Sequence, residues 1–334
     1  MILAGDIGGT KTILALYEAQ AGGPAQIAKE RYFCGDYEHL HDMIWAFIAT
    51  HGGADPVIDC ACIGVAGPIK DNRCVVTNLP WIVDARELGE YFGINRVELL
   101  NDLEAIACAV PHLQGNDLEV LNEGSADPAG VIGVVAPGTG LGEAYLTCRD
   151  GRYTAHPCEG GHTDFAANSE IEFALRNHLA EKYGHVSYER VASGGGIAEI
   201  YEFLRESGRY DEPEDLRSEI EDAGDPAPVI QRHLSGTAAL DICVETMRIF
   251  VVVLGAEVGN VALKLLARGG LYLAGGIPPK ILPLLRDGLF MESVLNKGRM
   301  SELVQDMPIC VVVGKDPGLR GAAMHAFELL NGEI

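Results

Sequence analysis

LAGDIGGTKT, residues 3–12, places Asp6, three glycines and Lys11 in one turn between two apolar segments. A Walker A phosphate loop reads G-x-x-x-x-G-K-[ST] and leads into a helix. Counted from Gly5, the second glycine position holds Thr10, and the continuation TILALYE has the β-branched and apolar residues typical of a strand. The stretch therefore predicts a hairpin of two strands and not a Walker A loop.

The same pattern occurs a second time. Residues 2–18 and 131–147 both consist of an apolar strand, a glycine-threonine turn and a returning strand. The second turn contains Gly138, Thr139 and Gly140, matches G-x-G-x-x-G poorly and leads into a strand, which disfavours a dinucleotide-binding fold. The repeat predicts two related domains that face each other.

Such glycine-rich turns have two interpretations. Glycines let the backbone approach a ligand closely, and successive exposed amides form a nest for an anion. Alternatively, they supply only the positive φ angles of a tight hairpin. Two turns in matching contexts favour phosphate binding, with Lys11 facing phosphate and Asp6 facing a magnesium ion through water.

Size and charge narrow the class of protein. The 334 residues, 48% of them hydrophobic, suffice for about two domains. With 25 basic and 48 acidic residues the formal charge is −23, which opposes binding to nucleic acid or to an anionic membrane. No signal peptide is indicated at the start, and the apolar residues 249–263, interrupted by Glu257, predict a buried core helix and not a membrane span.

The cysteines indicate the compartment. There are nine, mostly inside apolar segments, and an odd number fits no closed disulfide framework. Cys60 and Cys62 form C-x-C without a second pair, which is not a zinc pattern. We expect reduced thiols in a cytoplasmic protein.

Strands alternate with helices along the chain, which predicts an α/β architecture. A strand at residues 96–100 is followed by Asn101 and Asp102, and then by a helical pattern that lasts until Pro111. Further expectations are a buried strand at 62–69, a capping box of Ser169 and Glu172 before a helix to about Tyr183, a solvated acidic insertion at 207–228, a helix start at Pro278 and Pro279, and a helix at 317–330.

Asp102 has two compatible roles. As an N-cap its carboxylate accepts a backbone amide, which contributes about 1 kcal/mol. Ligand sites of open α/β sheets also lie at such strand ends, where a carboxylate kept ionised by the helix terminus can accept a proton from a substrate hydroxyl. The sequence therefore makes Asp102 a candidate general base.

The loop HPCEGGHTDF, residues 156–165, is the third candidate. Its glycines predict that Glu159 and His162 converge at the mouth of a loop. Three interpretations remain open: hydrogen bonding to a polyhydroxylated ligand, a purely structural loop, or a metal site that includes His156, whose spacing fits no common zinc pattern. Glu189 is a weaker candidate, because an isolated glutamate is usually only solvated.

Taken together, these motifs resemble the bacterial-type glucokinase family, the branch of actin-like, ribonuclease-H-like sugar kinases without a zinc motif. The resemblance covers nearly the whole chain and rests on GDIGGTKT, GVAGPI, TNLPW, LLNDLEA, APGTGLGEA, HPCEGGHTDFA, YERVASGGGI and LAGGIPPK in this order. It implies transfer of a phosphoryl group from ATP, with Mg²⁺, to the 6-hydroxyl of glucose, in a cytoplasmic homodimer.

The resemblance also implies a set of site residues. The phosphates would be held by Gly5, Asp6, Ile7, Gly8, Gly9, Thr10, Lys11, Gly138, Thr139 and Gly140, with Gly275 and Gly276 beside the adenosine. The sugar would be surrounded by Asn78, Asn101, Asp102, Glu159, His162 and Glu189, with Asp102 as general base.

The expected architecture is a small domain of residues 1–112 completed by the C-terminal helix 316–334, a large domain of residues 113–315, and a central cleft. The alternatives are a kinase for another hexose, a sensor that binds sugar and nucleotide without catalysis, and an actin-like or chaperone-type ATPase. An ATPase would not need Asn101, Asp102 or the loop with Glu159 and His162, and the sequence leaves open whether ATP or polyphosphate is the donor.

Overall fold

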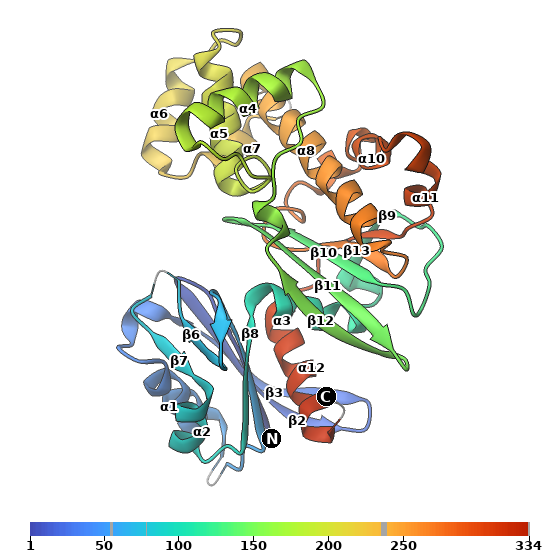
Figure 1. Ribbon diagram of the computed structural model, residues 1–334. Helices are drawn as coiled ribbons and strands as arrows, with labels where there is room; N and C mark the ends of the chain where they lie inside the picture. The colour runs from blue at the N-terminus through green and yellow to red at the C-terminus, as the bar shows by residue number, and fades with distance from the viewer. Residues whose placement is uncertain (54–55, 78, 235–238, 333–334) are drawn as a thin grey trace. The chain divides into compact units, whose positions relative to one another are not determined.

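The structure, a computed structural model, describes residues 1–53, 56–77, 79–234 and 239–332 (Figure 1). Internal contacts divide the chain into unit 1, made of Met1–Asp117, Arg152–Pro157 and Gly314–Ile334, and unit 2, made of Leu118–Gly151 and Cys158–Val313. These boundaries lie a few residues from the expected ones at 112 and 316. The inclusion of Arg152–Pro157 in unit 1 had no signal in the sequence.

Unit 1 is built on a five-stranded sheet of order β3-β2-β1-β4-β8. β1 pairs antiparallel with β2 and parallel with β4, which confirms the first hairpin. The strands are β1 (Ile2–Ile7), β2 (Lys11–Gln20), β3 (Gly23–Phe33), β4 (Cys60–Val65) and β8 (Arg96–Asn101), and a small second sheet contains β5 (Ile69–Lys70), β6 (Arg73–Val75) and β7 (Ile82–Asp84).

Helices cover both faces of this sheet. Because side chains alternate along a strand, Leu3 and Ile7 of β1 join one core with α1 and α2, while Ile2 and Ala4 join another with α3 and α12. The four helices are α1 (Leu40–His51), α2 (Ala85–Phe92), α3 (Asp102–Ala109) and α12 (Pro317–Asn331). Figure 1 shows α12, the last helix of the chain, beside α3 in the same unit.

In unit 2, strands follow one another in the order β11-β10-β13-β14-β9. β10 pairs antiparallel with β11, which confirms the second hairpin, and parallel with β13. The strands are β9 (Leu118–Asn122), β10 (Ile132–Pro137), β11 (Leu141–Arg149), β13 (Gly270–Leu273) and β14 (Ile309–Val312); β12 (Arg152–Cys158) comes next after β11 in the chain.

The core of unit 2 is centred on α8 (Asp241–Leu265), whose apolar residues are buried as the sequence predicts. In Figure 1 the helices α4 to α7 gather at one end of unit 2, and α8 runs from this group along the sheet. The other helices are α4 (Glu170–Tyr183), α5 (Gly194–Glu206), α6 (Glu214–Ala223), α7 (Pro226–Arg232), α9 (Leu282–Leu285), α10 (Leu289–Leu295) and α11 (Ser301–Gln305).

Two predictions of local structure outside the candidate site are wrong. The acidic residues 207–228 do not form only a solvated insertion: α6 and the start of α7 lie there, and Leu216 and Ala227 are buried in the core of unit 2. A few apolar side chains at helical spacing outweigh the acidic composition. The helix expected at Pro278 begins at Leu282 instead, as α9.

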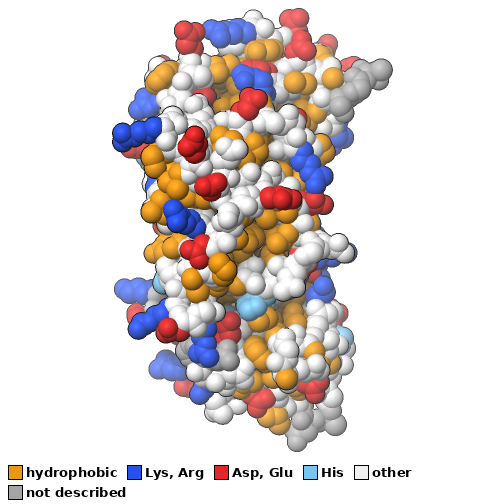
Figure 2. Space-filling view, turned by 90° about the vertical axis from the view of Figure 1, so that its right-hand side faces the viewer, with side chains coloured by type: hydrophobic (Ala, Val, Ile, Leu, Met, Phe, Trp, Pro, Cys, Tyr) orange, Lys and Arg blue, Asp and Glu red, His pale blue; other side chains and the backbone are white. Residues whose placement is uncertain are grey.

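The surface and the thiols agree with the composition. Acidic and basic side chains are interspersed on the face drawn in Figure 2. All nine cysteines are free, and six of them are buried. Within the described ranges, no helix combines the length and apolarity that a membrane span needs.

Candidate active site

The first group of candidate residues lies in unit 1, where β8 ends and α3 begins. Asn101 is the last residue of β8 and the N-cap of α3, and its Oδ1 accepts the amide of Leu103 at 2.9 Å. Its Nδ2 donates to the carbonyl of Gly67 at 3.2 Å, which connects the GVAGPI turn to the start of the helix. Asn101 therefore holds this strand end in place.

The expected N-cap is wrong by one residue. Asp102 is the first helical residue and not the cap, although its Oδ1 also accepts the Leu103 amide at 2.9 Å. Because Asn101 already satisfies that donor, helix capping does not require a carboxylate at position 102. The carboxylate lies at the carboxyl end of a parallel strand and at the N-terminus of a helix, where ligand sites of open α/β sheets lie.

Asp6 belongs to the same unit and lies near Asp102. Burial, together with the carboxylates of Asp102 and Asp316, raises the pKa of Asp6 to about 6. Asp316 pairs with Lys29 at 2.9 Å and with Arg31 at 3.5 Å, so its own charge is offset. Unit 1 thus concentrates negative charge around Asp6, which is where a cation would be stabilised.

The turn between β1 and β2 is exposed at its end, next to the start of β2. The amide of Gly8 donates to the carbonyl of Lys11 at 3.0 Å, and the side chains of Thr10 and Lys11 are exposed. Gly8 does not adopt a positive φ, but a Cβ there would lie 3.3 Å from the carbonyl oxygen of Lys11, which is a tight contact with backbone. The hairpin itself therefore favours glycine at this position.

The second turn, in unit 2, contacts the start of α5. The amide of Gly138 donates to the carbonyl of Gly140, and the amide of Gly194 donates to the carbonyl of Gly138, both at 2.8 Å. Gly194 is the first residue of α5, which Ser193 caps through the amide of Gly196 at 3.0 Å. A helix N-terminus is favourable for an anion, so α5 is a candidate phosphate contact that the sequence reasoning missed; the run SGGG, a cap followed by glycines, was its signal.

Glu189 lies against this turn. Its Oε2 accepts the amide of Leu141 at 3.0 Å, and a Cβ at Gly140 would lie 2.4 Å from the same oxygen. A side chain at position 140 would therefore displace the carboxylate of Glu189 from the Leu141 amide. The isolated glutamate that the sequence ranked low is part of an ordered site.

Glu159 and His162 converge, as the loop pattern predicts. Glu159 precedes the short 3-10 turn Gly160–His162 and His162 ends it, with His162 Nε2 3.7 Å from Glu159 Oε2. His162 Nδ1 is 3.8 Å from Glu189 Oε1, and the amide of Glu189 donates to the carbonyl of Gly161 at 2.8 Å. Unit 2 thus assembles three polar side chains, with exposed fractions of 87% for Glu159, 58% for His162 and 30% for Glu189, so they are available to a ligand.

Gly275 and Gly276 follow β13, and the fold requires glycine at only one of these two positions. Gly275 has φ +82°, and a Cβ there would lie 2.6 Å from the carbonyl of Pro137, so the fold itself requires this glycine. Gly276 has no described atom within 4 Å of the Cβ position and no positive φ. The described contacts therefore do not require glycine at position 276.

Two further candidates are Asn78 and His156. Asn78 lies outside the described residues. His156 belongs to unit 1, whereas Glu159 and His162 belong to unit 2. Within the described ranges, no group of three or more His, Cys, Asp or Glu side chains is suited to hold a metal ion.

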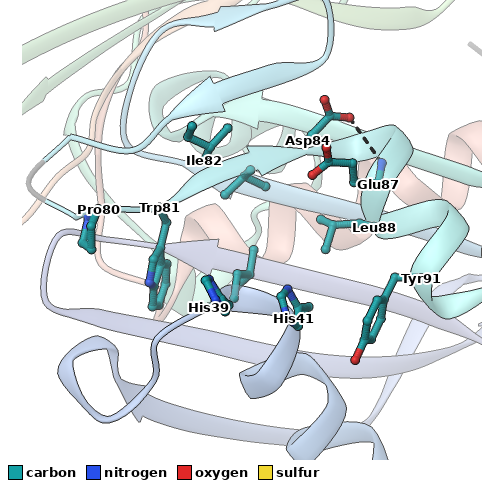
Figure 3. Close-up of a pocket in the computed structure, with 11 residues that line it drawn as sticks. His39, His41, Pro80, Trp81, Ile82, Asp84, Glu87, Leu88 and Tyr91 are labelled. Atoms are coloured by element: carbon teal, nitrogen blue, oxygen red, sulfur yellow. Dashed lines mark hydrogen bonds between the residues drawn. The ribbon is translucent and has the colours of Figure 1, made fainter.

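Unit 1 also has a pocket of about 460 Å³ that is lined by none of the candidate site residues, although Pro80 and Trp81 of the TNLPW motif are part of its wall (Figure 3). The rings of His39 and His41 stack at 4.9 Å, and the ring of Tyr91 is 4.9 Å from that of His41. Asp84, on its wall, caps α2 through the amides of Arg86 and Glu87. These contacts give the wall a structural role.

Known proteins resemble this chain over nearly its full length. A family model described as Glucokinase matches residues 3–329. Curated glucokinases of Nostoc punctiforme and Synechocystis sp. are 40% and 41% identical, covering 98% and 97% of this chain and 99% and 97% of their own lengths. The crystal structure of a glucokinase from an Antarctic psychrotroph is 31% identical, with a TM-score of 0.82 and coverage of 97% of this chain and 98% of that one.

The solved structure of a glucokinase from Balamuthia mandrillaris, in complex with glucose, shares the fold at 20% identity, with a TM-score of 0.74 and coverage of 97% of this chain and 93% of that one. Fold and relatives define an ATP-dependent hexose kinase with the actin-like ATPase fold. More narrowly, the chain belongs to the glucokinase family.

Proposed function

We propose that this chain transfers the γ-phosphoryl group of ATP to the 6-hydroxyl of glucose, with Asp102 as the general base. The observation that carries the proposal is the position of Asp102. Its carboxylate stands at the end of β8, at the positive end of α3 and near Asp6, while Asn101 already provides the helix cap. A carboxylate at this strand end can accept the proton of the sugar hydroxyl.

The remaining residues position the two substrates and stabilise the charge on the phosphates. Phosphoryl transfer depends mainly on alignment and on charge stabilisation. The amides of Gly8 and Gly138 donate within their turns, so we assign the phosphate oxygens to the neighbouring amides of these turns and to the N-terminus of α5. Glu159, His162 and Glu189 offer hydrogen bonds to sugar hydroxyls. We assign Lys11, exposed at the start of β2, to the phosphates.

The carboxylate of Asp6 fits a magnesium ion. It is largely buried beside Asp102 and Asp316, and a bound cation would offset their mutual repulsion. Magnesium commonly takes one or two carboxylates, water and substrate phosphates as ligands. When bound, it would neutralise charge on the phosphate oxygens.

The loop at residues 159–162 gives a prediction about sugar binding. We expect Glu159→Gln and His162→Ala each to raise the KM for glucose by about 10- to 100-fold, the range for losing a hydrogen bond to a charged group. The KM for ATP should change little. Steady-state kinetics with each substrate varied in turn measures both. Asp164→Asn is the control, since Asp164 is exposed near the loop and pairs with His185 at 2.9 Å; equal effects on both substrates would reject a sugar-facing loop.

The second turn gives a prediction about ATP. At Gly138 an added Cβ meets no described atom within 4 Å, and φ is not positive. We therefore expect Gly138→Ala to keep the wild-type melting temperature but to raise the KM for ATP by about tenfold or more, because the methyl group would stand where the amides meet phosphate. Thermal melting and ATP titration test this together. An unchanged KM for ATP would remove the turn from the phosphate site.

The experiment that tests the function as a whole is an ADP-release assay with glucose, mannose, fructose, N-acetylglucosamine and no sugar. We expect turnover to depend strictly on sugar and to be fastest with glucose. Faster turnover with another sugar would make the protein a kinase for that hexose. Binding of sugar and ATP without turnover would make it a sensor, and turnover without sugar an ATPase. Replacing ATP by polyphosphate identifies the donor.

A cytoplasmic homodimer, without nucleic-acid or membrane partners, completes the proposal. The family resemblance supports the homodimer and the cytoplasmic location. The formal charge of −23 opposes binding to nucleic acid or to an anionic membrane. Size-exclusion chromatography with light scattering tests the dimer directly.

A further inference from the structure

A buried carboxyl group that the proposed mechanism does not use lies beneath residues 159–162, the loop of Glu159 and His162, which we call the sugar loop. Glu143 is on β11, directly after the second glycine turn, and only 5% of it is exposed. Its Oε1 has no hydrogen-bond partner among the described residues. An ionised carboxylate so placed would lose its hydration without compensation, so this position favours the uncharged acid.

A second buried carboxyl group faces Glu143. Glu257 of α8 is fully buried, and its two oxygens accept from Lys264 Nζ at 3.1 Å and from Asn260 Nδ2 at 2.9 Å. A carboxylate oxygen can accept more than one hydrogen bond, so Glu257 can also accept the proton of an uncharged Glu143. Burial, and then the charge of Glu257, raise the pKa of Glu143 to about 7, although Lys264 acts in the opposite direction.

Other titratable groups complete the surroundings. Asn260 connects Glu257 to Tyr188 Oη at 2.9 Å and to Lys297 Nζ at 2.9 Å. On the loop side, Cys158 and Glu159 are close enough that the charges of Glu143 and Glu159 both raise the pKa of Cys158, after burial as the main cause. The groups around Glu143 are therefore Glu257, Lys264, Lys297, Tyr188, Cys158 and Glu159.

The sugar loop rests on the carboxyl group of Glu143. A Cβ at Gly160 would lie 1.9 Å from Glu143 Oε2, and one at Gly161 would lie 2.1 Å from the carbonyl of Leu141. The backbone between Glu159 and His162 is thus pressed against β11 without space for a side chain. Any change in the charge or hydration of Glu143 acts directly on this backbone.

We propose that Glu143, in its uncharged form, is the positioning residue that holds the loop of Glu159 and His162 in its sugar-binding conformation, and that its ionisation displaces the loop. Ionisation would set two carboxylates side by side in a buried site, and water admitted to solvate them would have to enter under Gly160. The effect on sugar affinity rests on the proposed function of this loop. The effect on the loop itself does not.

The first test follows the KM for glucose from pH 6 to 8.5. In the wild type we expect it to rise above pH 7, by up to about tenfold per pH unit if only the protonated form positions the loop. Glu143→Gln, which is uncharged at every pH, should remove this rise. Glu257→Gln should shift it to lower pH, because removing the neighbouring charge lets Glu143 ionise more easily. The KM for ATP should not follow the same profile.

Glu172→Gln is the matched control. Glu172 is also a buried glutamate of unit 2, but it contacts Asn168 and Ser169 at the start of α4. Its variant should keep the wild-type pH profile. A rise in KM that persists unchanged in both Glu143→Gln and Glu257→Gln would overturn the proposal.

A second readout separates this proposal from the proposed function. Hydrogen exchange of the peptide 158–165, corrected for the intrinsic effect of pH, reports the loop without any sugar. We expect protection to fall between pH 6.5 and 8 in the wild type and to persist in Glu143→Gln. If protection behaves so while Glu159→Gln and His162→Ala leave the KM for glucose unchanged, the positioning role stands and the sugar role fails. Protection that is independent of pH in the wild type would reject the positioning role.

Discussion

Asp102→Asn should lower kcat by about 10²- to 10⁴-fold, the range for losing a general base, and leave the KM for glucose nearly unchanged. The amide keeps the size of the side chain and an oxygen for the Leu103 amide. It cannot accept the proton of the sugar hydroxyl, so the loss belongs to the chemical step. Steady-state kinetics of ADP release measures kcat and KM separately.

Asp84→Asn is the control for this prediction. Asp84 is another carboxylate at the start of a helix in unit 1, where it caps α2 through the amides of Arg86 and Glu87. Asparagine caps helices about as well as aspartate, so this variant should keep wild-type turnover and stability. If Asp102→Asn also retained wild-type turnover, Asp102 would not be the base.

The second large effect is expected on stability. In most helices, replacing glycine by alanine stabilises by about 1 kcal/mol. Gly321 of α12 is different, because a Cβ there would lie 1.7 Å from the carbonyl oxygen of Ala105 and 2.8 Å from the amide of Ala109, both on α3. Backbone atoms cannot yield as a flexible side chain does. We expect Gly321→Ala to lower the free energy of unfolding by about 1–3 kcal/mol or more.

Urea unfolding followed by circular dichroism tests this prediction. Gly195→Ala is the control, since Gly195 is an exposed helical residue of α5 and only Ser193 Oγ, at 3.7 Å, is near its Cβ position. That variant should be as stable as the wild type or slightly more stable. Equal stability of Gly321→Ala and Gly195→Ala would show that α12 can move away from α3 at no cost. This matters for the site, because α12 starts beside Asp6: a Cβ at Gly318 would lie 3.1 Å from Asp6 Oδ2.

Local patterns predicted most of the elements that carry the site. The alternation of apolar residues gave both hairpins, and the capping box of Ser169 and Glu172 gave the start of α4, with Ser169 Oγ accepting the amide of Glu172 at 3.4 Å. These signals work because a strand or a cap depends on residues within a few positions of each other. The acidic residues 207–228 were misjudged because average composition hides the few side chains, such as Leu216, that reach the core.

Local sequence signals also identified some of the candidate site residues and missed others. Asp102 and the glycine turns stood out in the sequence because their chemistry is tied to a nearby strand end or turn. The cap at Asn101 was missed, since both residues at this helix start have capping side chains and only backbone geometry separates them. The start of α5 beside Gly138 was missed because the two segments are distant in the chain.

The sequence alone determines three features: the alternating α/β pattern, the two glycine hairpins and the carboxylate after β8. Each of them depends on the preferences of neighbouring residues. Packing in three dimensions is what brings Asp316 to Asp6, Glu189 to Leu141, and the carboxyl of Glu143 to Glu257 and to the backbone of Gly160. These pairs join segments far apart in the chain. Their energies come from burial and from charges at short range, which exist only after the chain has folded.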